Sequence, residues 1–216
     1  MLVDPTDEDR HPPDADPWWA ETYVFDLWTP DLAVGAFTWM TLLPVQRRAW
    51  YWSVLVRDGE PLIHVADTDL PLPTAGLRVR TTGLWADHHC EAPFEQWTVR
   101  NECHAVALED PADALGRAYG TAAAVAFDVE WYATGPVVAV AGGYRQDGEA
   151  HAVIEVAGGP LEVVGGAARS HTWGALELPP GPVDPGRHDA YLRGPDDLAV
   201  HRTLTAAGWA TATITP

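Results

Sequence analysis

Residues 50–66 read Trp-Tyr-Trp-Ser-Val-Leu-Val-Arg-Asp-Gly-Glu-Pro-Leu-Ile-His-Val-Ala. Two apolar runs rich in β-branched and aromatic residues, 50–56 and 62–66, flank the dipeptide Asp58-Gly59. Asp-Gly between such runs is typical of a type I′ turn that joins antiparallel strands. This stretch therefore predicts a β-hairpin and indicates an antiparallel fold.

The same alternation of apolar and polar residues recurs before and after this hairpin. Residues 21–28 and 35–43 predict a second hairpin, and later segments repeat the pattern with almost no helical periodicity. The later strands are expected at residues 77–82, 96–108, 125–131, 149–156, 161–164, 190–193, 198–204 and 209–214. About a dozen short strands at this spacing favour an all-β antiparallel sandwich or barrel.

Length and composition indicate one main folded unit. The chain has 216 residues and is 47% hydrophobic, enough for one sizeable core, with two small domains as the alternative. Residues 1–17 are acidic and rich in proline, which predicts a mobile arm or a strap across a barrel end. Residues 18–216 are then expected to form a single barrel domain, which the last strands complete.

The formal net charge of −18 argues against nucleic acid or an anionic membrane as a partner. No apolar run reaches membrane-spanning length, and the first residues lack the apolar core of a secretory signal, so a cytoplasmic protein is expected. Cys90 and Cys103 are too few for a disulfide framework but could form one bridge if their strands are neighbours. The oligomeric state stays open.

The stretch Gly165-Gly-Ala-Ala-Arg-Ser-His-Thr-Trp-Gly174 brings a base, a cation and a large aromatic together between glycines. In an extended strand, Arg169, His171 and Trp173 share one face. That face could line a cavity that holds an apolar molecule and moves a proton. The alternative is an outward strand whose tryptophan packs under a loop.

Aromatic residues share faces of several predicted strands, and such faces would either fill a barrel lumen or line an apolar pocket. The candidate ligand-binding residues are Tyr23, Phe37, Trp39, Trp50, Trp52, Trp131, Arg169 and Trp173. Indole faces also stabilise cations, which suits chemistry through a carbocation. Asp26 and Glu21 are candidate proton donors, because a carboxyl kept partly dry has a raised pKa.

The sequence gives little support for a metal site or for other catalytic motifs. His88-His-Cys-Glu91 contains metal-ligand types, but adjacent ligands without a second pair at the proper spacing are weak evidence. The sequence has no phosphate-binding loop, no nucleophile elbow and no His-Glu-x-x-His pattern. We therefore expect neither a metal nor a cofactor.

Three motifs resemble the AttH and hydroxyneurosporene-synthase-like family: Trp19-Ala-Glu-Thr-Tyr-Val-Phe25, Gly35-Ala-Phe-Thr-Trp39 and residues 165–174. The family signature looks like Gly-x-Arg-Asp-His-Ser-Trp-Gly, and here Ser170 and Thr172 replace its Asp and Ser. The resemblance implies a lipocalin-like antiparallel β-barrel related to acyclic carotenoid hydratases and Diels–Alder-type cyclases. It also implies catalytic roles for His171 and Trp173, whereas the acidic residue further along in those longer proteins cannot be equated with Asp184 or Asp189.

These observations predict a cofactor-independent enzyme that binds an apolar polyene, terpenoid or polyketide and promotes its cyclisation, isomerisation or hydration. His171 would transfer the proton, and Arg169 or Glu21 would tune it. One alternative is a non-catalytic carrier of a hydrophobic small molecule. Another is a structural accessory protein with a filled core.

Overall fold

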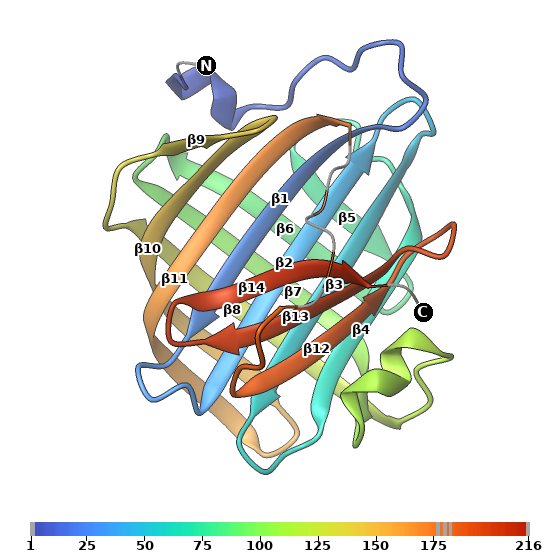
Figure 1. Cartoon of the computed structure of the whole chain (residues 1–216), viewed down its shortest axis with the longest axis vertical. Helices are drawn as coiled ribbons and strands as arrows, with labels where there is room; N and C mark the ends of the chain where they lie inside the picture. The colour runs from blue at the N-terminus through green and yellow to red at the C-terminus, as the bar shows by residue number, and fades with distance from the viewer. Residues whose placement is uncertain (1–2, 176–177, 179–180, 182, 215–216) are drawn as a thin grey trace.

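The computed structural model describes residues 3–175, 178, 181 and 183–214, and it is an antiparallel β-barrel (Figure 1). Eight strands close a ring in the order β4-β3-β2-β1-β11-β10-β8-β7, with β7 paired back to β4. Hairpin β5–β6 continues the sheet from β7, and β9 pairs with β10. The bounds are β1 (Trp19–Trp28), β2 (Val34–Leu43), β3 (Arg48–Arg57), β4 (Leu62–Pro71), β5 (Leu77–Thr81), β6 (Leu84–Ala92), β7 (Gln96–Leu108), β8 (Thr121–Ala133), β9 (Val138–Val140), β10 (Gly143–Val156) and β11 (Gly159–Ala175). The predicted all-β fold is confirmed.

The hairpin of residues 50–66 is present as β3 and β4, but its turn differs from the expected one. Glu60 donates its backbone N–H to the carbonyl of Arg57, which closes a turn around Asp58 and Gly59. Of these two central residues, Gly59 alone has a positive φ, of 71°. A type I′ turn needs positive φ at both, so that part of the prediction is wrong.

The last three strands, β12 (His188–Arg193), β13 (Ala199–Thr205) and β14 (Gly208–Ile214), form a separate sheet. In Figure 1 this sheet crosses the outside of the barrel wall over β1, β2 and β3. The prediction that these strands complete the barrel is therefore wrong. The outer faces of β2 and β3 are themselves apolar, and the extra sheet removes them from water: Trp209 meets the ring of Phe37 edge-on at 5.0 Å.

Strands β1 to β3 are consequently buried on both faces, which explains their near-continuous apolar sequences. The barrel interior is packed by one cluster, which includes Tyr23, Phe25, Met40, Tyr51, Trp97, Phe127 and Trp131. A second cluster, here called the outer layer, joins the outer face of β1–β3 to β12–β14 and contains Phe37, Trp39, Trp50, Trp52, Leu204 and Trp209. The sequence left two alternatives for the barrel interior, filled or hollow, and side chains of this first cluster pack it.

The N-terminal residues cross one end of the barrel, above β1, β10 and β11 (Figure 1). They begin with a short 3₁₀-helix, η1 (Pro5–Glu8), which is held by an Asp4 cap. From Val3 to Pro17, Glu8 is the one buried residue. A second 3₁₀-helix, η2 (Pro111–Leu115), connects β7 to β8. Within the described residues, no helix is long and apolar enough to span a membrane.

The two cysteines lie on the neighbouring strands β6 and β7, yet both are free thiols. Cys90 stands opposite Trp97, and Cys103 stands opposite Leu84, so the register keeps them apart. Burial raises the pKa of Cys90 to about 11 and that of Cys103 to about 12. Both sulfurs are therefore held as thiols at neutral pH.

Candidate functional site

Strand β11 places its alternate side chains inside the barrel end that the N-terminal arm covers. Tyr23 of β1 and Tyr144 of β10 flank His171 directly in the register. Two residues away on the same two strands, Gln146 of β10 stands opposite Arg169 of β11. Arg169 and His171 are 2% and 0% exposed, so the prediction of a shared, inward face is correct and the alternative of an outward strand is wrong.

His171 and Glu21 form a hydrogen-bonded pair in the dry interior. Nε2 of His171 lies 2.9 Å from Oε1 of Glu21, and both residues are fully buried. Since a carboxylate only accepts, the imidazole is the donor at Nε2. Its Nδ1 has no hydrogen-bond partner. Tyr23 stacks on the imidazole at 3.9 Å and directs its hydroxyl to the same Glu21 oxygen at 3.3 Å.

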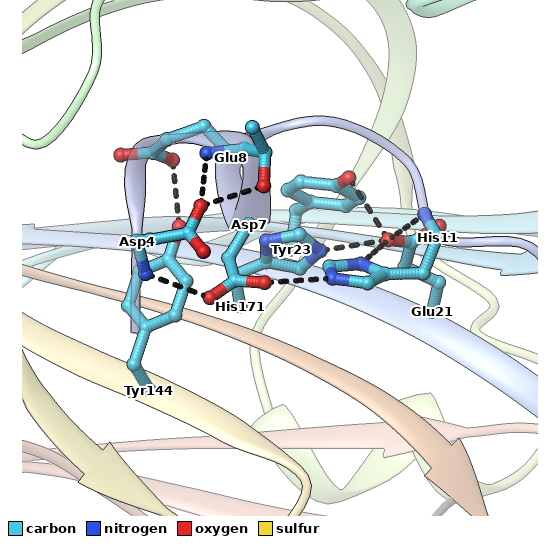
Figure 2. Close-up of polar contacts among 9 residues, drawn as sticks. Asp4, Asp7, Glu8, His11, Glu21, Tyr23, Tyr144 and His171 are labelled. Carbon is cyan, nitrogen blue, oxygen red and sulfur yellow. Dashed lines mark hydrogen bonds and ion pairs between the residues drawn. The ribbon is translucent and has the colours of Figure 1, made fainter. Parts of the chain in front are cut away.

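The arm adds His11 to this pair (Figure 2). Nδ1 and the backbone N of His11 lie 2.8 and 2.9 Å from Oε1 of Glu21. The His11 ring stacks on Trp173 at 3.7 Å, and its Nε2 faces Asp7 of the arm at 3.3 Å. Four donors thus converge on one oxygen of Glu21, while Oε2 of the same carboxyl has no partner.

Burial and charge shift the pKa values at this site in ways that suit proton transfer. Desolvation lowers the pKa of His171 below its usual value, although the hydrogen bond and charge of Glu21 oppose that shift. Burial alone would raise the pKa of Glu21, but the hydrogen bonds and charge of His171, with His11, bring it below the ordinary value. The pKa of Tyr23 is raised well above its usual value, chiefly by burial. At neutral pH the site holds a neutral imidazole against a carboxylate.

Arg169 lies beside this pair and takes a different partner. Its guanidinium binds both carboxylate oxygens of Glu8. Its Nε donates to Gln146 at 3.2 Å. The charge lies 5.0 Å from the ring centre of Trp131 and 5.1 Å from that of Tyr144. The arm therefore reaches this end of the barrel through Glu8 and His11, and its Arg10 donates to the carbonyl of Pro73 at 2.9 Å.

Three of these residues offer ligands to a metal ion. One ligand atom each from His11, Glu21 and His171 lie within 4.8 Å of one another, and two imidazoles with one carboxylate are a donor set used for zinc and iron. Among the described residues, the His88-to-Glu91 stretch contributes no ligand to such a group. Burial lowers the pKa of His88 to about 3.

The predicted site residues divide into two groups. His171, Glu21, Tyr23, Arg169 and Trp173 meet at the covered barrel end, and Trp131 joins them through Arg169. The structure places the remaining predicted residues, Asp26, Phe37, Trp39, Trp50 and Trp52, on the opposite face of the wall, in or beside the outer layer. For the four aromatic residues, the expected position in a lumen beside His171 is wrong, because the outer sheet covers the face of β2 and β3 that carries them.

Asp26 has a structural partner there. Both of its carboxylate oxygens accept from Arg202 of β13 at 2.9 Å. An acid held in this way joins the outer sheet to the barrel. It is separated from His171 by the strand itself, since residues 23 and 26 of β1 point to opposite faces.

Sequence reasoning missed Glu8, His11, Tyr144, Gln146 and Trp97. Tyr144 and Gln146 alternate on the strand that pairs with β11, so a correct strand pairing would have found them. Glu8 and His11 carry no such signal, because an acidic, proline-rich arm has no apolar periodicity.

Pockets of about 560, 500, 330 and 180 Å³ open elsewhere on the described surface. The first lies at the far end of the barrel and includes Cys103 and His104. The smallest lies between β11 and the outer sheet, beside Asp26 and Arg202. None of these four is lined by His171 or Glu21, because the arm covers that barrel end.

A family model described as "Domain of unknown function (DUF7064)" matches residues 4–181. The chain belongs to this family. The DUF7064 region spans the arm and the strands up to β11, and it includes Glu8, His11, Glu21, Arg169 and His171. The strands β12–β14 follow the region that the DUF7064 model matches. No curated protein and no solved structure matches the chain.

Proposed function

We propose that this protein is an enzyme that transfers a proton to or from an apolar, unsaturated small molecule, and so promotes its cyclisation, isomerisation or hydration. The observation that carries the proposal is the buried His171–Glu21 pair, whose imidazole keeps one nitrogen, Nδ1, without a partner. A base oriented by a carboxylate, with its second nitrogen free, is the arrangement that general acid–base catalysis uses.

In this proposal Glu21 fixes the tautomer of His171. The Nε2–H bond to Glu21 leaves the lone pair on Nδ1, which accepts a proton from the substrate. The imidazolium that forms is stabilised by the Glu21 carboxylate, and it then gives the proton to another carbon of the substrate, which completes an isomerisation. In a hydration, Nδ1 takes the proton instead from the water that adds to the substrate, and the imidazolium delivers it to carbon. The pKa of His171, lowered by burial, keeps the imidazole neutral and ready to accept.

The surrounding rings stabilise the positive charge of the imidazolium that forms on His171. Trp173 lies 5.0 Å from His171, and the rings of Tyr23 and Tyr144 lie 3.9 and 5.6 Å from it. Aromatic faces attract cations, most strongly where water is excluded. The sequence resemblance to carotenoid hydratases, which carry catalytic histidine and tryptophan at these motif positions, supports the same class of reaction.

The test is turnover of a panel of acyclic carotenoids, terpenoids and polyketides in heavy water, with products followed by chromatography and mass spectrometry. We expect one class to give a product that contains solvent deuterium. His171→Gln should lower the rate by about 10²- to 10⁴-fold, the usual contribution of general acid–base catalysis. His151→Gln, at an exposed position on β10, is the matched control and should leave the rate unchanged.

Two outcomes would contradict the proposal. If ligands bind without forming any product, and His171→Gln changes only their affinity, the protein is a carrier. If a chelator abolishes turnover and added zinc restores it, the three potential ligands His11, Glu21 and His171 hold a metal instead, and His171 is not the base.

A further inference from the structure

The carboxylate of Glu8 sits in a complete set of donors supplied by the barrel. Its Oε2 accepts from the hydroxyl of Tyr144 at 2.6 Å and from Arg169 at 2.9 Å. Its Oε1 accepts from the other guanidinium nitrogen and from the backbone N–H of Phe94 at 2.7 Å. We call these donors, from Arg169, Tyr144 and Phe94, the carboxylate cradle.

The barrel builds this cradle without help from the arm. The side-chain oxygen of Gln146 accepts from Nε of Arg169 at 3.2 Å and from its NH2 nitrogen at 2.9 Å, and these two hydrogen bonds fix the orientation of the guanidinium group. Trp97 and Trp131 pack against its faces at 5.6 and 5.0 Å. Phe94 has a φ of 60°, a left-handed conformation that is unfavourable outside glycine, and its N–H reaches the carboxylate.

The arm, in contrast, buries few of its own side chains at this contact. Glu8 is 5% exposed, but every other described residue from Val3 to Pro17 is exposed or only partly buried. Lifting the arm breaks the Glu8 ion pair, the hydrogen bonds of His11 to Glu21 and the stacking of His11 on Trp173, so a ligand that displaces the arm must replace these contacts. Leaving the buried Arg169 without any partner would be costly, whereas exchanging one carboxylate for another keeps the pair.

We propose that the cradle is the binding site for the carboxylate of the ligand, and that Glu8 occupies it in the ligand's absence. The inference rests on the proposed function and names its substrate class: an apolar, unsaturated carboxylic acid. A neutral ligand cannot replace Glu8, because it would leave the guanidinium charge buried and uncompensated.

The cradle lies next to the His171–Glu21 pair, so a ligand held there reaches the base. Tyr144 binds Glu8 with its hydroxyl, and its ring packs edge-on against His171 at 5.6 Å. The arm also places the flat ring of His11 on Trp173 at 3.7 Å, with 5.4 Å between the centres of the two histidine rings. A ligand that displaces both side chains would set its carboxylate on Arg169 and a planar, unsaturated segment on Trp173.

The experiment measures equilibrium binding of cis-parinaric acid, a conjugated polyene fatty acid, and of its methyl ester, by energy transfer from tryptophan to the polyene. We expect the unsubstituted protein to prefer the acid by about tenfold or more, the scale of one charge-assisted contact. Glu8→Ala should strengthen binding of the acid by about tenfold, because the internal competitor is gone, and should leave the ester unchanged. Tyr144→Phe should weaken binding of the acid alone.

Asp9→Ala is the matched control, since it removes the same charge from the neighbouring exposed position of the arm. It should change neither affinity. Equal binding of acid and ester, or weaker binding of the acid by Glu8→Ala, would overturn the proposal and leave Glu8 as a structural clasp. His171→Gln should retain the preference for the acid, so loss of turnover with retained binding separates a failure of the catalytic proposal from a failure of this one.

Discussion

Among the described residues, two buried arginine–carboxylate pairs have a similar local geometry but differ in the segment that carries the carboxylate. Arg202 binds both oxygens of Asp26 and lies over the ring of Phe37 at 4.3 Å, in the outer layer. Arg169 binds both oxygens of Glu8 and lies over Trp131 at 5.0 Å, at the covered barrel end. In each case a guanidinium is desolvated by indoles and paired with one carboxylate.

The difference lies in the segment that carries the carboxylate. Asp26 belongs to β1, a strand paired on both sides and covered by a second sheet. Glu8 belongs to a short 3₁₀-helix in the arm, and every other described residue of the arm is exposed or only partly buried. The Arg202–Asp26 pair is therefore fixed within the fold, whereas the Arg169–Glu8 pair can exchange its carboxylate. The apolar contacts around each carboxylate decide how easily it is displaced.

The largest effect is expected from the outer pair. Asp26→Ala should lower the free energy of unfolding by about 3 to 5 kcal/mol, since it leaves Arg202 buried without its partner. Glu8→Ala should cost about 1 kcal/mol, because water reaches Arg169 once the arm is free. Urea unfolding of both variants measures the contrast, and Asp128→Ala, at an exposed ion pair with Arg100, is a control expected to stay within about 0.5 kcal/mol. Equal losses for Asp26→Ala and Glu8→Ala would show that the arm is as integral as the sheet.

A smaller effect is expected on the pH dependence of stability, through a histidine at the contact between β4 and β12. His64 is buried there, its Nε2 lacks a partner, and burial lowers its pKa to about 4. Below pH 6.5 the unfolded chain takes up a proton at this histidine that the folded chain refuses, so stability falls as the pH drops from 6.5 towards 4. His64→Leu should remove about 1.4 kcal/mol per pH unit of that dependence.

Denaturant unfolding between pH 7 and 4 tests this expectation, and His151→Leu, at an exposed position, serves as the control. A His64→Leu variant whose stability falls as steeply as that of the parent protein would place the acid sensitivity elsewhere.

The smallest effect tests the exchange of Glu8. Arg10 is the one Arg or Lys in residues 1–17, so trypsin can cut the arm there. If a carboxylic acid releases the arm, cis-parinaric acid should speed cleavage after Arg10 by roughly two- to fivefold, since proteolysis follows the population of the open form. Its methyl ester should not. Mass spectrometry of the fragments measures both rates, and slower cleavage with the acid than with the ester would argue that the ligand closes the arm.

The fold was largely predictable because strand patterns are local. Alternation of residue type in β11 was enough to put Arg169, His171 and Trp173 on one face, and alternation in β1 separated Asp26 from Tyr23. The same reasoning failed for Trp39, Trp50 and Trp52. Both faces of β2 and β3 are apolar, so nothing in their own sequences tells which face is inside, and the answer came from the sheet β12–β14 packed against one of them.

The candidate site was predictable only in part for a related reason. Glu21 and His171 are 150 residues apart and meet because β1 pairs with β11. Glu8 and His11 come from an arm without any periodic pattern, and their partners are known only once the arm is seen across the barrel end.

By itself, the sequence determined an acidic, antiparallel β-protein with a base, a cation and an indole on one face of a late strand. Those features depend on neighbouring residues and on the twofold period of an extended backbone. Only the tertiary structure decided which tryptophans lie in the barrel, that a carboxylate orients His171, and that Glu8 fills the cradle of Arg169. Those contacts join residues far apart in the chain, and the free energy that selects them comes from burial and charge pairing in the closed barrel.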